Sequence, residues 1–100
     1  MSTMVRSIEE AQRLAAHMAG VRFEETVFTE APDLKVMDAG TAMLDPTSET
    51  GKAACERAMT GQKGYRFKNC EGVEVGVVVA PFREGFCVWA VTPSGVCLRF

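Results

Sequence analysis

The sequence predicts an α+β fold in which two helices pack on a mainly antiparallel sheet, in the order α-β-β-α-β-β-β-β. Three observations predict it. Residues 64–100 alternate in hydropathy through four strands, residues 7–20 have the apolar spacing of a surface helix, and residues 46–60 show a second helical pattern. One hundred residues provide one core, so we expect a single domain over residues 1–100.

The C-terminal strands form a meander because three groups of turn residues separate them. Cys70–Gly72 suits a three-residue hairpin with glycine in the left-handed position. Pro81–Gly85 is a loop of turn-forming residues, and Thr92–Gly95 suits a tight turn. We therefore expect four consecutive antiparallel strands.

These turns also predict the strand registers. They place Phe67 opposite Val75 and Trp89 opposite Leu98, and every register gathers apolar side chains on one inner face, since side chains alternate with period two. The expected inner face consists of Tyr65, Phe67, Val73, Val75, Val77, Val79, Cys87, Trp89, Val91, Val96, Leu98 and Phe100.

The first helix begins with a capping box, in which Ser7 is the N-cap and Glu10 the third helical residue, and it ends at Gly20. Its apolar residues fall on one arc, which we expect to be buried. The arc consists of Met4, Ile8, Ala11, Leu14, Ala15 and Met18.

Two short strands are expected between the helices, at Val21–Phe28 and at Leu34–Met37. The second helix is capped by Thr47 or Ser48 and stops at Gly61. This order of elements is similar to that of roadblock-type and profilin-like regulatory domains, in which helices cover an antiparallel sheet. The similarity is one of topology.

Composition excludes several classes of function. A net charge of −2 gives no basic footprint for nucleic acid, and no apolar run approaches the length of a membrane helix. The first residues lack the apolar region of a secretion signal, and the four cysteines show no paired spacing. We expect a cytoplasmic protein with reduced thiols that binds neither membrane nor nucleic acid.

No motif identifies a reaction. His17 is the only histidine, and it lies opposite the apolar arc of its helix, so it is poorly placed to serve a cysteine nucleophile. Pro46–Ala53 differs from a phosphate-binding loop at two positions. Tyr65–Lys68 interleaves aromatic and basic residues as single-strand binders do, but its two aromatic side chains are expected in the core.

A metal site is not expected either. The acidic residues lack the fixed spacing of a calcium loop, and a single histidine with scattered cysteines offers no ligand cluster. These acids are Glu30, Asp33, Asp38, Asp45 and Glu49. We therefore predict a protein that is not an enzyme and has no cofactor or metal.

The outer face of the sheet is more apolar than a solvated face should be. It is expected to carry an apolar centre with a charged rim, which is typical of a protein-binding or dimerisation surface. The candidate binding residues are Arg66, Lys68, Val78, Phe86, Val88 and Arg99. The alternative is that a helix, or the Val21–Met37 segment, covers this face from within the chain.

The sequence thus favours a small protein-binding module without catalysis. It would be an accessory, regulatory or inhibitor protein, of the kind that phages and mobile elements direct against a host protein complex. Its partner is another protein or a second copy in a homodimer. The alternative is a small-molecule-sensing domain, with a pocket between residues 41–60 and the sheet lined by Met43, Met59 and Trp89.

Overall fold

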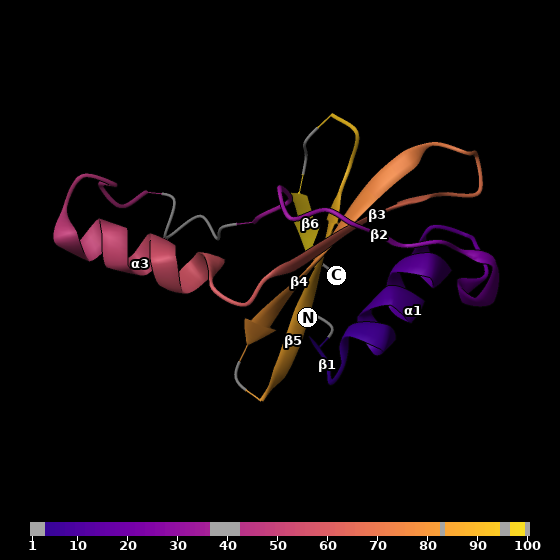
Figure 1. Ribbon diagram of the computed structural model, residues 1–100, viewed down its shortest axis with the longest axis horizontal. Helices are drawn as coiled ribbons and strands as arrows, with labels where there is room; N and C mark the ends of the chain where they lie inside the picture. Colours follow the sequence, from indigo (N-terminus) through magenta and orange to yellow (C-terminus); the bar gives the residue numbers. More distant parts are fainter. Residues whose placement is uncertain (1–3, 37–42, 83, 95–96, 100) are drawn as a thin grey trace.

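The computed structural model describes residues 4–36, 43–82, 84–94 and 97–99. Its elements are β1 (Met4–Val5), α1 (Ile8–Met18), the 3₁₀ turn η1 (Phe23–Glu25), β2 (Thr29–Glu30), α3 (Glu49–Met59), β3 (Lys63–Lys68), β4 (Glu74–Phe82), β5 (Gly85–Val91) and β6 (Cys97–Arg99). The α+β class, with helices and an antiparallel sheet that ends in a meander, is confirmed (Figure 1).

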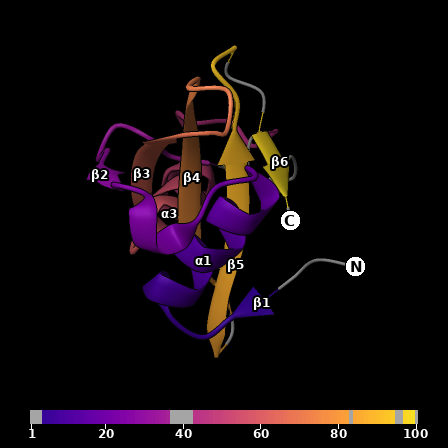
Figure 2. The ribbon, with the colours of Figure 1, turned by 90° about the vertical axis from the view of Figure 1, so that its right-hand side faces the viewer.

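The strands form one antiparallel sheet in the order β1-β5-β4-β3-β2, and β6 also pairs with β5. Met4 pairs with Cys87 and Arg99 with Trp89, so β1 and β6 follow one another along the same edge of β5. Figure 2 shows both short strands on that side of β5. The edge of the sheet is therefore built from two segments that lie far apart in the sequence.

Helix α1 begins and ends at the expected residues. The Ser7 hydroxyl accepts a hydrogen bond from the backbone N–H of Glu10, whose carboxylate accepts from the N–H of Arg6, both at 3.1 Å. At the other end Gly20 adopts a φ of 75°, and the N–H of Val21 donates to the carbonyl of Ala16. This is the glycine-terminated Schellman pattern of a helix end.

Helix α1 covers one face of the sheet and forms the core with it. The helix residues Ala11 and Ala15 are buried against side chains of four strands. The core cluster consists of the buried residues Val5, Ala11, Ala15, Tyr65, Phe67, Val77, Val79 and Val88. Small helix side chains allow the helix to approach the sheet closely.

The register between β3 and β4 is confirmed. Tyr65 pairs with Val77 and Phe67 with Val75. The turn between the strands is the expected three-residue loop, in which Gly72 has a φ of 77°. The side-chain oxygen of Asn69 accepts hydrogen bonds from two backbone N–H groups of this loop, at 2.9 and 3.0 Å, and so fixes it.

The registers of the last two hairpins are wrong by one residue each. Strand β4 continues to Phe82, which pairs with Gly85, so the loop is shorter than the sequence suggested. Val79 therefore pairs with Val88, and Trp89 and Cys87 move to the face opposite α1. The second shift pairs Leu98 with Ala90. It cancels the change of face that the first shift causes, so Leu98 stays on the α1 face. Val96 and Phe100, which were expected on the inner face, lie outside the described residues.

The two strands expected before the second helix are also wrong. Val21–Phe28 contains η1, and the local strand is β2, after it. Of the expected strand Leu34–Met37, the described residues 34–36 are not in a strand, and Met37 lies outside the described part. The observed order, which starts with β1, departs from the regulatory-domain topology that the sequence suggested.

Residues 31–36 instead cross the second face of the sheet. A Cβ atom placed on Gly64 would lie 2.7 Å from the Cβ of Leu34, and one placed on Gly76 would lie 2.9 Å from its Cδ1. The buried Gln62 side chain exchanges two hydrogen bonds with the backbone of Val36, at 2.9 and 2.7 Å. Internal cover by the Val21–Met37 region was the alternative to an exposed outer face, and residues 31–36 provide part of that cover.

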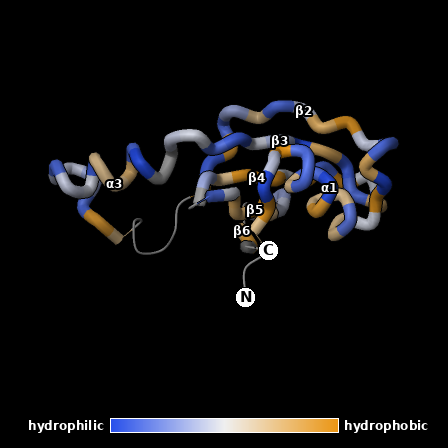
Figure 3. Tube along the Cα trace, turned by 90° about the horizontal axis from the view of Figure 1, so that it is seen from below, coloured by the Kyte–Doolittle hydropathy of each residue, from blue (hydrophilic) through white to orange (hydrophobic). Residues whose placement is uncertain are grey.

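Helix α3 lies at one end of the molecule, beyond the sheet, while α1 lies at the other (Figures 1 and 3). Ser48 is its N-cap and accepts a hydrogen bond from the N–H of Gly51 at 3.0 Å. The Gly61 that follows the helix has a φ of 78°. We call residues 43–59 the α3 arm.

Candidate functional site

The six candidate binding residues do not form one surface. Val78 and Val88 are both fully buried, and they lie on opposite faces of the sheet because Val78 pairs with Trp89. Phe86 is half-buried and packs against the core cluster on the α1 face. The prediction that these side chains share an exposed face is wrong, because it depended on the register of β5.

The charged members of that set have different surroundings. Arg66 makes ion pairs with Asp33 and with Glu74, while Lys68 is exposed. Arg99 lies in β6, and its side chain is outside the described part of the chain. Arg66 therefore joins the 31–36 segment to the sheet.

An apolar groove lies between the C-terminal half of α1 and the sheet. Its volume is about 290 Å³. It is lined by Ala15, Met18, Ala19, Phe67, Asn69, Val75, Gly76, Val77, Ala90, Val91 and Thr92. No charged side chain is among these lining residues, so the groove offers mainly apolar contacts, with Asn69 and Thr92 as its polar side chains.

Two exposed apolar side chains flank this groove. Met18 exposes 62% of its surface, although its place on the apolar arc of α1 predicted burial. Leu98 exposes 55% and lies beside Ala90, a residue of the groove. The sheet has six strands in the described part of the chain, and helix α1 is too narrow to cover its whole α1 face. Met18 and Leu98 are therefore left exposed beside the helix.

The walls of the apolar groove are held together by the backbone. The N–H of Cys70, in the β3–β4 turn, donates a hydrogen bond to the carbonyl of Ala19 at 3.2 Å. This bond ties the end of α1 to the tip of the β3–β4 hairpin. The groove is therefore formed by elements that are fixed relative to one another, which favours binding without a large rearrangement.

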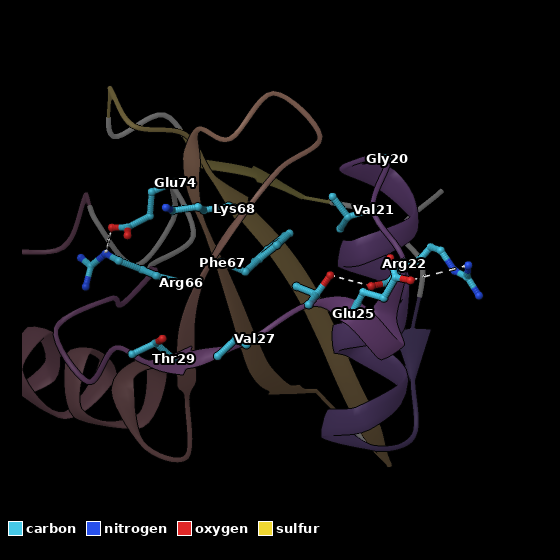
Figure 4. Close-up of a pocket in the computed structure, with 11 residues that line it drawn as sticks. Gly20, Val21, Arg22, Glu25, Val27, Thr29, Arg66, Phe67, Lys68 and Glu74 are labelled. Carbon is cyan, nitrogen blue, oxygen red and sulfur yellow. Dashed lines mark hydrogen bonds and ion pairs between the residues drawn. The ribbon is translucent and has the colours of Figure 1, made fainter.

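A second groove, of about 590 Å³, lies between residues 20–29 and the outer edge of β3 (Figure 4). We call it the mixed groove. It is lined by Gly20, Val21, Arg22, Glu25, Thr26, Val27, Thr29, Arg66, Phe67, Lys68 and Glu74. Phe67 points from β3 toward Val21, and Val27 exposes 80% of its surface.

The charged side chains of the mixed groove form one ion pair on each side of it. Arg22 lies 3.7 Å from Glu25 on one side, and Arg66 lies 3.9 Å from Glu74 on the other. Arg66 also donates to both carboxylate oxygens of Asp33. These hydrogen bonds lower the pKa of Asp33 and raise the pKa of Arg66.

The residues weighed for catalysis and metal binding are dispersed. His17 is exposed on α1, as its helical position predicted. Among the residues that the structure describes, no three His, Cys, Asp or Glu side chains lie close enough together to hold a metal ion. Cys55, Cys70 and Cys87 are free thiols.

The pocket expected between residues 41–60 and the sheet stays a prediction, because part of its expected lining lies outside the described residues. Met43 exposes 87% of its surface, and the α3 arm extends away from the sheet. The side chain of Met59 lies outside the described part. In the ranges that the structure describes, neither helix is long and apolar enough to cross a bilayer.

The sequence missed the apolar groove because its border is set by where α1 ends on the sheet. The available signal was the length of α1, whose described helix of 11 residues is about 16 Å long and cannot cover every strand.

Comparison with protein-family models, with curated proteins and with solved structures finds no match to this chain.

Proposed function

We propose that this chain is a small protein-binding module that acts without catalysis, as an accessory, regulatory or inhibitor protein. The observation that carries the proposal is the apolar groove beside α1. Its border side chains Met18 and Leu98 are large, apolar and more than half exposed. Exposed apolar side chains gathered around a groove are typical of surfaces that another protein covers.

The chemistry of the groove supports a protein partner. A mostly apolar lining with two polar residues suits the apolar stripe of a partner helix or a short apolar segment. Met18 adds a flexible side chain that adapts to the shape of a partner. The free thiols of Cys55, Cys70 and Cys87 support a reducing compartment, so we place the protein in the cytoplasm.

The test is affinity capture from the native host with three baits, followed by mass spectrometry. The wild type and Val27→Glu should retain the same partner, and Met18→Glu should lose it. Val27 is a matched control because it is at least as exposed as Met18 but lies outside the apolar groove. A partner captured equally by all three baits would refute binding through the groove.

A small-molecule-sensing role is the second candidate, and the mixed groove favours it. Its volume lies within the range of about 300–1,000 Å³ that is usual for ligand sites. Amide NMR shifts of Val21, Thr26 and Lys68 under a metabolite panel would test it. Shifts confined to these residues would support a sensor, and unchanged spectra across the panel would oppose it.

A further inference from the structure

The molecule is longer and exposes more surface than a compact chain of its mass. It measures 45 × 29 × 24 Å. Its accessible surface is 6641 Å², which is about 1,000 Å² more than a compact monomer of 10.9 kDa would expose. This excess is similar to the roughly 800 Å² that each partner buries in a stable protein complex.

The α3 arm begins with two exposed apolar side chains, Met43 and Leu44, which we call the apolar tip. Met43 exposes 87% of its surface, and the adjacent Leu44 exposes 40%. Both residues belong to the α3 arm, which lies away from the sheet and α1 (Figure 3). Two consecutive apolar side chains in this position add unburied surface without contributing to the core.

The apolar tip and the apolar groove lie toward opposite ends of the long axis, because the arm is at one end and α1 at the other (Figure 1). Two copies placed side by side with their long axes antiparallel bring the arm of each toward the groove of the other. The two arm–groove contacts are then identical and are related by a two-fold axis. The assembly is therefore complete with two copies.

We infer that the protein seated in the apolar groove is a second copy of this chain, whose Met43 and Leu44 pack against Met18 and Leu98. This inference rests on the proposed protein-binding role of the groove and names its partner. Each copy contributes the tip to one contact and the groove to the other. The exchange buries the exposed apolar side chains at both ends of the molecule.

The first test is the mass of the purified chain by size-exclusion chromatography with light scattering. The wild type should have twice the chain mass of 10.9 kDa. Met43→Glu and Met18→Glu should each reduce the mass to that of one chain, because a carboxylate would be buried in an apolar contact. Val27→Glu should remain a dimer. All three substitutions are at exposed positions, and circular dichroism checks that each variant is folded.

The second test is a charge exchange across the contact. Met18→Lys alone should give a monomer. Combined with Met43→Glu in the same chain, it places opposite charges in both copies of the arm–groove contact, and the double variant should recover the dimer mass. Recovery distinguishes a direct contact between these positions from a general loss of stability.

A wild type that remains a monomer would overturn the inference, as would a dimer that persists in both single glutamate variants. A monomer whose capture of a host protein still depends on Met18 would overturn the second-copy partner and leave the proposed function intact. A dimer that depends on Met18 and Met43 supports both the second-copy inference and the proposed function. If Met18→Glu kept both the dimer and the capture of a host protein, the second-copy inference and the proposed function would both be refuted.

Discussion

Arg66 holds Asp33 in a bidentate ion pair, with its two terminal nitrogens 3.0 and 2.6 Å from the two carboxylate oxygens. The pair joins β3 to the segment that crosses the second face of the sheet. Planar guanidinium and carboxylate groups match in this geometry, which makes it more specific than a single contact. Because the side chain of Asp33 is 66% exposed and that of Arg66 is 36% exposed, the main role of the pair is to position the segment.

Arg66→Ala should return the pKa of Asp33 toward its ordinary value. The ion pair lowers this pKa, so its contribution to stability is present above the ordinary value and is lost as pH falls through the folded-state pKa. Carbon-13 NMR titration of the carboxyl groups measures the change. Asp45 is the internal control, because its pKa is lowered by Thr47 and should not move. An unchanged Asp33 titration would contradict the ion pair.

Gly64→Ala should destabilise the protein by about 1–3 kcal/mol, as overpacking of a core does. The new Cβ would lie 2.6 Å from the carbonyl oxygen of Ala31 and 2.7 Å from the Cβ of Leu34. Thermal or urea denaturation measures the loss. Gly72→Ala is the comparison, since it meets no atom within 4 Å and carries only the strain of its positive φ. A Gly64→Ala variant as stable as the wild type would show that residues 31–36 do not lie on this face.

Val88→Ala should cost about 2–3 kcal/mol, since it removes buried methyl groups and leaves a cavity in the α1 core. The same substitution at Val73, which is 42% exposed, should cost well under half as much. Urea denaturation of the two variants compares them directly. If Val73→Ala were the more damaging change, the burial of Val88 in the core beneath α1 would be contradicted.

Ser7→Ala and Ser48→Ala remove equivalent helix caps but should differ in effect. Loss of a cap costs about 1 kcal/mol of local helix stability. Because α1 is part of the core, Ser7→Ala should lower the melting temperature of the whole protein. The α3 arm lies beyond the sheet, so Ser48→Ala should speed hydrogen exchange in α3 and leave the main transition in place. Equal shifts in melting temperature would argue that α3 is part of the core.

The elements with local signals could be predicted from the sequence. The Ser7 cap, the glycine-terminated end of α1 and the three-residue turn before β4 each depend on a few adjacent residues. The pairing of β3 with β4 followed from that turn. These features are confirmed because short-range backbone geometry determines them.

The register of β5 could not be predicted in the same way, because this strand is apolar on both faces. Phe86, Val88 and Ala90 are as apolar as Cys87, Trp89 and Val91, so alternation does not indicate which set faces α1. Such runs are typical of strands buried on both sides. The turn before β5 then decides the register, and Pro81 and Phe82 belong to the strand rather than the loop.

The apolar groove and the α3 arm depend on tertiary placement. The helical pattern correctly places Met18 on the apolar arc of α1, but apart from the short length of α1 the sequence gives no signal that part of the sheet is left open. Likewise, the caps of α3 predict a helix and say nothing of its direction from the sheet. The candidate site therefore became visible only with the fold.

The strand edge that β1 and β6 share has a consequence for the order of events during synthesis. Met4 and Val5 find their partners in Cys87 and Phe86, which leave the ribosome only when most of the chain has been made. The core residues of α1 depend on the same late strands. The residues of β1 and α1 thus emerge with little to fold against, and cooperative folding waits until β5 has been synthesised.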